Sequence, residues 1–281
     1  MWDAMMEKNM ILYEDNDLIV CHKMAGIPVQ SARIGQKDMV SILNNYLSEK
    51  KNVSQEVFVV HRLDQPVEGV IVFAKNKKAA AGLSKQITDG SMKKRYQAVV
   101  CATEQGEKLR RKFENETELS GSDEHKGVDK ERYTLIDYLM KNGKTNRSEV
   151  VDQSEKEAKR AELSFKLLDR MDETAGVGQK KYALISIDLK TGRHHQIRVQ
   201  MSHAGLPLYG DQKYHEDWKE YVLKEEEPEN ELFGYFGSAP AKKNPALALC
   251  SVELKFRHPV TGKQMKFETK PTAEAFGFFH A

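Results

Sequence analysis

One short motif joins a carboxylate to a guanidinium at the end of an apolar segment. Asp64 closes the tetrapeptide that starts at His61, and Arg62 lies two residues before it. A carboxylate can act as a nucleophile that forms a covalent intermediate. The same arrangement is also typical of a structural ion pair. The motif therefore makes Asp64 a candidate nucleophile, but by itself it does not decide between chemistry and structure.

A second motif concentrates hydrogen-bond donors within residues 190–198. Arg193, His194, Gln196 and Arg198 follow a predicted strand and a Thr-Gly turn. Side chains of these types contact phosphate, ribose and base edges in nucleic-acid complexes. The alternative interpretation is a helix cap together with a buried arginine that pairs with a carboxylate.

The third motif places an aromatic ring behind basic side chains, since Tyr96 follows Lys94 and Arg95. Such a ring stacks on a base or fills a hydrophobic core. Segment 75–97 carries seven Lys or Arg residues against one acidic residue, whereas segment 216–231 carries eight acidic residues. A compact basic segment attracts phosphates and an acidic one repels them, although a solvated helix face explains the lysines equally well.

Composition and missing motifs exclude several function classes. The 281 residues are 40% hydrophobic and 31% charged with a net charge of +2, as in ordinary globular proteins. The first residues lack the features of a signal peptide, and no segment reaches the ~20 apolar residues of a membrane span. We therefore expect a cytoplasmic protein with no membrane partner. P-loop, GxGxxG and GxSxG motifs are also missing from the sequence.

Neither the histidines nor the cysteines are spaced as metal ligands. The histidines near 194–215 do not follow the HExxH pattern, and no cysteine joins them. The cysteines are odd in number and far apart, which predicts buried reduced thiols instead of disulfides or a zinc site. They are Cys21, Cys101 and Cys250. We expect no metal.

Hydrophobic periodicity places these motifs among many strands and few helices. The predicted strands cover a hairpin at 10–23, then 57–60, 70–74, 96–102, 163–168, 183–189, 247–256 and 264–269. The predicted helices cover 39–47 after Asp38, 77–87 after Asn76, and 193–204. Since no regular βαβ alternation is present, the pattern favours an α+β fold with a mixed or antiparallel central sheet and flanking helices and loops.

Two polar segments interrupt this pattern without dividing the chain. Residues near 103–160 are polar and charged apart from an apolar patch at 133–140, and residues near 215–245 are acidic and rich in proline and glycine. We interpret the first as an excursion and the second as a surface loop. Residues 1–281 are therefore expected to form a single domain.

Five segments together cover much of the chain in a fixed order. They are ILYEDNDLIVCHKMAGIPV (11–29), HRLDQPVEGVIVFAKN (61–76), KRYQAVV (94–100), IDLKTGRHHQIRVQMSHAGLPLYGD (187–211) and LALCSVELKFRHPVTG (247–262). In this order they resemble the RluA-type pseudouridine synthase family. The resemblance implies a monomeric enzyme that converts uridine to pseudouridine in structured RNA, either rRNA or tRNA, without cofactor or metal. We expect no S4 module, because none fits ahead of residue 11.

The resemblance also implies roles for individual residues. Asp64 is the nucleophile, Arg198 orients it bidentately, and Tyr96 stacks on the target base and assists proton transfer from C5. Arg62 enters the space that the flipped uridine leaves. Whether Asp64 attacks the ribose C1′, attacks the ring or abstracts a sugar proton stays open. Further RNA contacts are expected from His61, Leu63, Lys93, Lys94, Arg95, Arg193 and Gln196.

Three places depart from the usual pattern of this family. Val67 and Glu68 replace a pair of small hydroxyl residues, His194 replaces a threonine, and Gln200 replaces a common histidine. These positions neighbour the inferred nucleophile, so we expect them to affect substrate choice and efficiency more than the type of reaction.

The resemblance makes a geometric prediction, and two other functions remain open beside it. A carboxylate oxygen of Asp64 should lie within about 4 Å of the Arg198 guanidinium, with the Tyr96 ring beside them. The alternatives are a non-catalytic RNA-binding protein on the same fold, and a hydrolase that uses the carboxylate to release a free base. Incubation with uridine-labelled RNA distinguishes all three.

Overall fold

The computed structural model of the protein describes residues 10–33, 35–51, 56–101, 132–173, 180–215, 218 and 245–279. The first strands are β1 (Ile11–Glu14), β2 (Leu18–Lys23), β3 (Phe58–Val59), β4 (Glu68–Ala74) and β5 (Lys93–Cys101). The later strands are β6 (Tyr133–Asn142), β7 (Arg147–Val151), β8 (Lys159–Glu173), β9 (Lys180–Leu189), β10 (Leu249–Arg257) and β11 (Gln264–Glu268). The helices are α2 (Met39–Lys51), α3 (Lys77–Thr88), α5 (Gln196–His203) and the 3-10 helix η1 (Glu274–Phe279).

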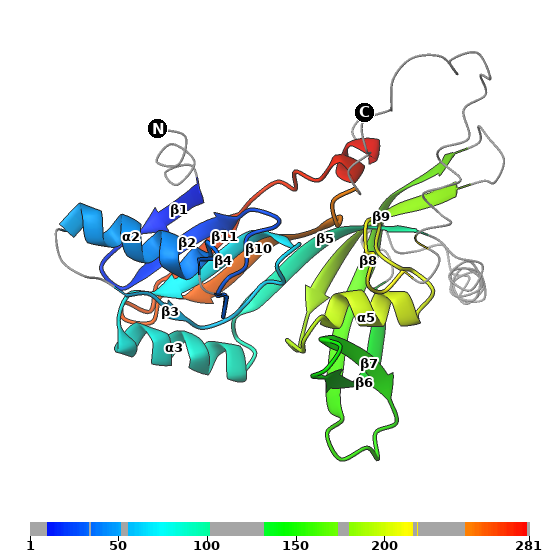
Figure 1. The fold of residues 1–281 in the computed structure, drawn as a ribbon, viewed down its shortest axis with the longest axis horizontal. Helices are drawn as coiled ribbons and strands as arrows, with labels where there is room; N and C mark the ends of the chain where they lie inside the picture. The colour runs from blue at the N-terminus through cyan, green and yellow to red at the C-terminus, as the bar shows by residue number, and fades with distance from the viewer. Residues whose placement is uncertain are drawn as a thin grey trace, which may run out of the picture.

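The described strands form one 11-stranded sheet in the order β1-β2-β4-β10-β5-β9-β8-β6-β7, with β3 and β11 pairing outside this path (Figure 1). Neighbouring strands are antiparallel except for β4 and β10, which run parallel. The sheet is therefore mixed, and the predicted α+β class is confirmed. No helix in the described residues is long and apolar enough to cross a membrane.

The two faces of the sheet are covered by different helices, and β4 contributes to both. Ile71 and Phe73 pack in a cluster with residues of α2, whereas Val70, Val72 and Ala74 pack in a cluster with residues of α3. This alternation follows from the two-residue period of a strand. All three cysteines are buried and form no disulfide with one another, as predicted.

The two predicted helix caps at Asp38 and Asn76 are confirmed. The Asp38 carboxylate accepts a hydrogen bond from the backbone N–H of Ser41 at 2.8 Å, and the Asn76 side chain accepts one from Ala79 at 2.9 Å. Each bond satisfies a backbone donor that has no partner within the first helical turn. The side chains therefore fix where α2 and α3 begin.

Part of the predicted polar excursion belongs to the sheet. Strands β6 and β7 form a hairpin that pairs with β8, so residues 133–151 extend the sheet beyond β9. The apolar patch at 133–140 is one strand of this hairpin, and its inward residue Leu139 packs against Val199 of α5. Residues 102–131 of the excursion and nearly all of the acidic segment at 215–245 lie outside the described residues.

The Val67–Glu68 departure has a structural explanation next to Gly69. Glu68 is 2% exposed, and its carboxylate accepts backbone N–H bonds from Thr272 at 2.7 Å and Ala273 at 3.2 Å. This side chain therefore ties β4 to the segment after β11. Gly69 has φ +119°, and a Cβ there would lie 2.3 Å from the backbone oxygen of Ser251, so only glycine fits.

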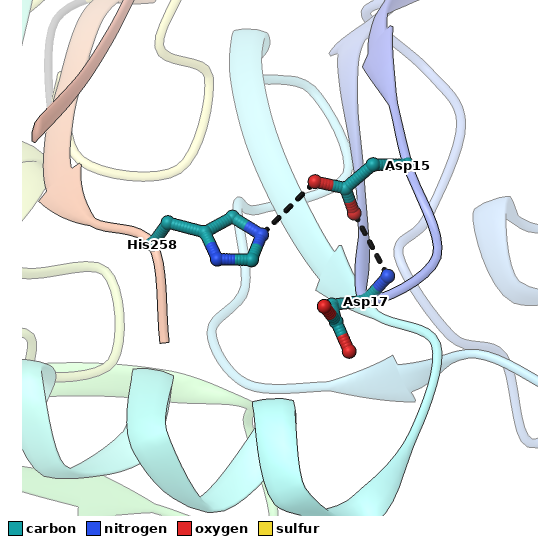
Figure 2. A group of neighbouring side chains, drawn as sticks. All are labelled: Asp15, Asp17 and His258. Atoms are coloured by element: carbon teal, nitrogen blue, oxygen red, sulfur yellow. Dashed lines mark hydrogen bonds and ion pairs between the residues drawn. The ribbon is translucent and has the colours of Figure 1, made fainter. Parts of the chain in front are cut away.

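Asp15, Asp17 and His258 come close enough together to suggest a metal site, but their hydrogen bonds indicate a structural role (Figure 2). The Asp15 carboxylate accepts N–H bonds from Asp17 and Leu18 at 2.8 Å, and it also contacts His258 Nε2 at 2.9 Å. His258 Nδ1 accepts the backbone N–H of Thr261 at 3.0 Å. Nε2 thereby joins the β10–β11 turn to the β1–β2 turn, and Nδ1 stabilises the β10–β11 turn itself.

Candidate active site

The loop that carries Asp64 connects β3 to β4 and is fastened by a buried lysine. The ammonium of Lys23 donates hydrogen bonds to the backbone oxygens of Gln65 at 3.1 Å, Ile27 at 2.7 Å and Met24 at 3.0 Å. Burial lowers the pKa of Lys23 to about 8, and the Asp64 carboxylate acts in the opposite direction. The loop position of Asp64 thus depends on contacts to the backbone beside it.

Arg198 reaches Asp64 from the first turn of α5. Its Nη1 lies 3.5 Å from Asp64 Oδ2, within the predicted limit. The bidentate expectation was wrong, because the fork of this guanidinium binds Asp211: Nε contacts Oδ2 at 2.8 Å and Nη2 contacts Oδ1 at 2.7 Å. Asp211 therefore fixes the plane of the guanidinium, and Asp64 meets its remaining edge.

The protonation of Asp64 depends on two opposing influences. Desolvation raises the pKa of Asp64, and the positive charge and hydrogen bond of Arg198 lower it, with a net shift above the ordinary value. The side chain keeps 27% of its surface exposed, and the described residues give its Oδ2 two charged or ionisable neighbours, Arg198 and His195. Asp64 is therefore partly desolvated and still open to a ligand.

His195 lies beside Asp64 in a fixed orientation. Its Nε2 is 3.7 Å from Asp64 Oδ2, and its Nδ1 is 2.7 Å from the Tyr214 hydroxyl. Burial, followed by the charge of Arg198, lowers the pKa of His195 to about 2, so the ring is neutral. Its φ of 54° places it in the left-handed region, which costs about 1 kcal/mol for a residue other than glycine. The N-terminus of α5 thus stores strain beside the carboxylate.

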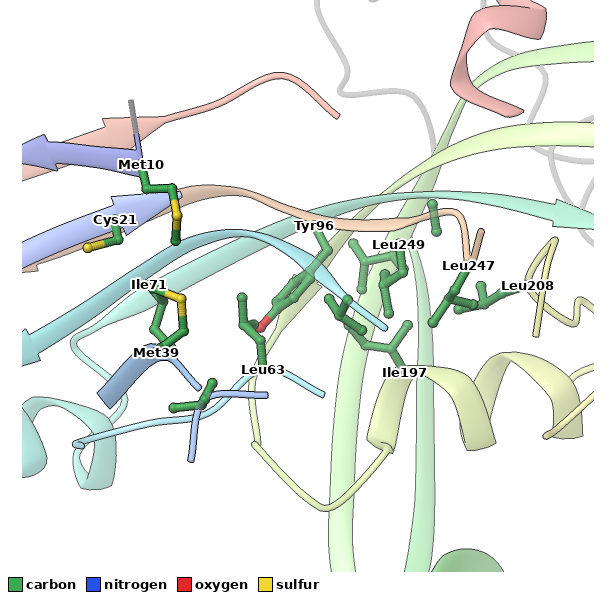
Figure 3. Close-up of a cluster of buried hydrophobic side chains, with 14 of the residues drawn as sticks. Met10, Cys21, Met39, Leu63, Ile71, Tyr96, Ile197, Leu208, Leu247 and Leu249 are labelled. Carbon is green, nitrogen blue, oxygen red and sulfur yellow. The ribbon is translucent and has the colours of Figure 1, made fainter. Parts of the chain in front are cut away.

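Tyr96 lies on β5 with its ring in the cluster that also contains Leu63 and Ile197 (Figure 3). The tyrosine is 5% exposed. Burial raises its pKa, and the negative charge of Asp64 acts in the same direction, so the hydroxyl stays protonated. Residues 64, 96 and 198 therefore converge, although they are far apart in the sequence. Leu63 is buried beneath the loop instead of facing outward as an RNA contact would.

The other residues predicted to contact RNA divide by exposure. Arg62 is exposed and contacts Gln30 at 3.1 Å, without an ion pair to Asp64 among the described residues. Arg193 is exposed and donates to the backbone oxygen of Arg160 at 2.9 Å. His61 is half-buried and accepts the backbone N–H of Val72 at 3.2 Å. Arg62 and Arg193 thus remain accessible to a ligand.

Gln196 cannot serve as the expected RNA contact in this conformation. Its amide oxygen accepts bonds from Thr191 at 2.8 Å and from the backbone of Arg193 at 2.9 Å. Its amide nitrogen donates to Glu162 at 3.1 Å and to Gln200 at 2.9 Å. The side chain is buried and all of its hydrogen-bonding groups have partners, so its role is to join α5 to the preceding turn.

The basic run 93–95 does not form one continuous surface. Successive residues of β5 point to opposite faces, so Lys94 shares the face of Tyr96 while Lys93 and Arg95 lie on the other. Arg95 is paired with Asp188 at 3.1 Å and Glu253 at 3.6 Å. Burial lowers the pKa of Lys94 to about 8, and no hydrogen bond or ion pair holds it within the described chain. Lys94 is the member of the run that faces the site.

Three residues of the site were not predicted from the sequence to belong to it. Asp211 lies in the GxPLxGD segment and His195 in HHQIR, so their motifs marked them, but no role followed from spacing alone. Tyr214 had no sequence signal. Its hydroxyl accepts the backbone N–H of Ser148 at 2.8 Å, and the Arg198 guanidinium lies 5.1 Å from its ring centre.

Comparison with known proteins places this geometry in a family. The model of a family described as RNA pseudouridylate synthase matches residues 17–203, which include Asp64, Tyr96 and Arg198. The tRNA pseudouridine synthase C of Vibrio parahaemolyticus is 26% identical over 258 residues, covering 91% of this chain and 87% of that protein. Ribosomal large subunit pseudouridine synthase D of Zymomonas mobilis is 28% identical over 265 residues, covering 92% and 68%.

Solved structures share the fold at lower sequence identity. Human RNA pseudouridylate synthase domain containing 4 superposes with a TM-score of 0.62 at 18% identity, covering 96% of this chain and 93% of that chain. Human RNA pseudouridylate synthase domain containing 1 gives a TM-score of 0.57 at 17% identity, covering 94% and 88%. The chain therefore belongs to the RNA pseudouridylate synthase family and is an RNA pseudouridine synthase, an isomerase.

Proposed function

We propose that this enzyme isomerises specific uridines in folded RNA, either transfer RNA or large-subunit ribosomal RNA, with Asp64 as the catalytic nucleophile. Relatives named for both kinds of RNA match most of the chain. The observation that carries the proposal is the Asp64 carboxylate, which is 27% exposed and lies 3.5 Å from a guanidinium whose other edge is bound to Asp211.

The reaction is an isomerisation that moves one bond. The N1–C1′ bond of uridine breaks, the base turns, and a C5–C1′ bond forms. C5 loses a proton and N1 gains one, so no electrons enter or leave. The protein has to supply a nucleophile, hold the loosened base and move one proton.

The surroundings of Asp64 suit this role. Arg198 favours the ionised carboxylate, and because Asp211 holds the guanidinium bidentately, that charge stays in place while Asp64 reacts. The Tyr214 oxygen already accepts the Ser148 N–H, which favours donation of the phenol proton to His195 Nδ1. Neutral His195 then carries its ring proton on Nε2, the atom that faces Asp64. At 3.7 Å this approach is longer than a hydrogen bond, so His195 borders the carboxylate without adding a charge.

Tyr96 and Arg62 complete the proposed site. The Tyr96 ring provides an apolar surface beside Asp64 on which the target base stacks. Because its hydroxyl stays protonated, it assists proton transfer from C5 as a relay that gives up its own proton as it takes another, and not as a base. Extrusion of a stacked uridine costs a few kcal/mol. The exposed Arg62 side chain is free to enter the space that the base leaves, where its planar group stacks and donates hydrogen bonds.

The test is incubation of uridine-labelled transcripts with the pure enzyme, with transfer RNA and large-subunit ribosomal RNA in separate reactions. Pseudouridine in one of them identifies the substrate. Asp64→Asn keeps the size of the side chain and serves as the control, and it should form none. Release of free uracil would indicate a hydrolase, and RNA binding without product would indicate a non-catalytic protein. Either result would overturn the proposal.

A further inference from the structure

The hairpin of β6 and β7, residues 133–151, projects beyond α5 and is called the wing here (Figure 1). Lys141, Lys144 and Arg147 are all exposed at its end. Lys213, from the loop after α5, joins them by donating a hydrogen bond to the backbone oxygen of Asn146 at 2.9 Å. Four cationic side chains thus gather at one end of the sheet.

The positive charges of the wing are not neutralised within the part of the chain that the structure describes. No carboxylate there forms an ion pair with any of the four side chains, in contrast to Arg95, which has two. Burial, followed by the charges of Arg198 and Arg147, lowers the pKa of Lys213. Glu149 of β7 is also exposed, and the charges of Asp211 and Asp64 act to raise the pKa of Lys213. Cations nevertheless outnumber acidic side chains at this end of the wing, which fits a polyanion.

The wing is joined to Asp64 by an unbroken series of contacts. The backbone N–H of Ser148 in β7 donates to the Tyr214 hydroxyl at 2.8 Å, and this hydroxyl is 2.7 Å from His195 Nδ1. His195 Nε2 is in turn 3.7 Å from Asp64. A ligand on the wing therefore lies against the same structure that borders the carboxylate.

Two departures from the family pattern fasten the wing to α5. His194, where threonine is usual, contacts the Ser148 hydroxyl at 2.9 Å. Gln200, where histidine is common, donates to Asp137 of β6 at 2.7 Å. Two of the three departures thus hold the wing, while the third, Val67–Glu68, ties β4 to the segment after β11.

We propose that the wing binds the sugar–phosphate backbone of the target RNA outside the uridine site, with Lys141, Lys144 and Arg147 on phosphates. This inference rests on the proposed function. The contacts are electrostatic and independent of base sequence, so they position the RNA while the site around Asp64 selects the uridine. They also place the phosphate-binding surface away from the basic segment 75–97.

The first test measures binding of an RNA duplex as a function of salt. The variant Lys141→Gln/Lys144→Gln/Arg147→Gln should flatten the slope of log K against log salt by about 3, because each lost phosphate contact removes roughly 0.9. Lys77→Gln/Lys78→Gln alters two exposed lysines on α3, at the other end of the sheet, and should leave the slope unchanged.

The second test measures turnover of transfer and ribosomal RNA transcripts. The wing variant should raise KM at least about tenfold while kcat stays within a few-fold, since phosphate contacts serve ground and transition states alike. Arg147 lies 5.4 Å from the Tyr214 ring centre, so Lys141→Gln/Lys144→Gln, which leaves that contact intact, is tested in parallel. It should show about two thirds of the change in slope.

The outcomes separate this inference from the proposed function. If the wild type forms pseudouridine but both wing variants keep its salt slope and KM, the wing inference is overturned. A wild type that forms no pseudouridine refutes the proposed function, whereas the duplex-binding slope still decides whether the wing binds phosphates.

Discussion

Asp64 and Asp211 lie on two different loops and share one guanidinium, yet their surroundings differ. Asp211 is 1% exposed, binds Arg198 through both oxygens and also accepts backbone N–H bonds from Lys213 and Tyr214. Asp64 is 27% exposed and touches Arg198 through one oxygen at 3.5 Å. The Asp211 carboxylate accepts four hydrogen bonds and holds its partner in place, whereas the Asp64 carboxylate keeps accepting capacity for a ligand. The same arginine thus holds a buried structural pair and borders the carboxylate that we propose as the nucleophile.

The largest expected effect is on activity, and it comes from replacing Asp64, the more exposed of the two aspartates. Asp64→Asn should lower pseudouridine formation by about four orders of magnitude, because the amide is not a nucleophile. The melting temperature should stay the same or rise, since removing a partly desolvated charge relieves a cost. Turnover and thermal unfolding are measured on the same preparation. A pure mutant that keeps several per cent of wild-type turnover would contradict the comparison.

Asp211, the buried carboxylate, should matter mainly for stability. Asp211→Asn leaves the buried Arg198 charge without its main partner, which should lower the free energy of unfolding by about 3–5 kcal/mol. Denaturant titration measures the change. Asp188→Asn removes a more exposed carboxylate that pairs with Arg95 and Arg132 near the surface, and its effect should stay below about 1 kcal/mol. Equal losses in both variants would mean that burial does not distinguish Asp211.

Replacement of the shared cation tests whether its shape matters. Arg198→Lys keeps the charge, but a single ammonium cannot bind Asp211 bidentately and also reach Asp64. Turnover should fall about 100-fold through misplacement, with RNA affinity nearly unchanged. Arg160→Lys, in a surface pair with Glu162, is the matched substitution and should leave turnover unaffected. Full activity of Arg198→Lys would show that charge alone is sufficient.

The smallest expected effect is an upward shift of the pH at which activity is lost in acid. The nucleophilic role that we propose for Asp64 requires the ionised carboxylate, and burial raises its pKa above the ordinary value despite Arg198. Activity should therefore be lost as pH falls through a midpoint above the ordinary Asp value of about 3.9. Profiles of kcat/KM against pH, with unfolding followed at each pH, measure this midpoint. A midpoint at or below the ordinary value would mean that the stabilisation of the carboxylate by Arg198 cancels or outweighs its desolvation.

Local sequence rules predicted much of the frame around this site. The caps at Asp38 and Asn76 depend on bonds within four residues, so their spacing was sufficient to place both helices. The approach of Arg198 to Asp64 followed from the family motifs. The bidentate partner of Arg198 did not, because one guanidinium near two aspartates has several possible pairings and only packing selects among them.

Other differences arose from tertiary contacts that no local pattern contains. Gln196 has the chemistry of an RNA contact, but burial against Glu162 and Gln200 uses all of its hydrogen bonds. The hairpin of β6 and β7 was missed because its outer face is polar, and its inner face is completed by α5, which follows much later in the chain. The separation of Lys94 from Arg95, by contrast, was available from strand alternation.

The place of β10 in the sheet has a consequence for how the protein is made. This strand lies between β4 and β5, so the loop of Asp64 and the strand of Tyr96 are bridged by a segment synthesised much later. About 150 residues separate the end of β5 from the start of β10, which corresponds to roughly 7–30 s of translation. During that interval the edges of β4 and β5 that β10 will occupy stay open on the ribosome, where exposed strand edges invite aggregation. The candidate site can be completed only after residue 257 has left the ribosome, so its assembly is among the last steps of folding.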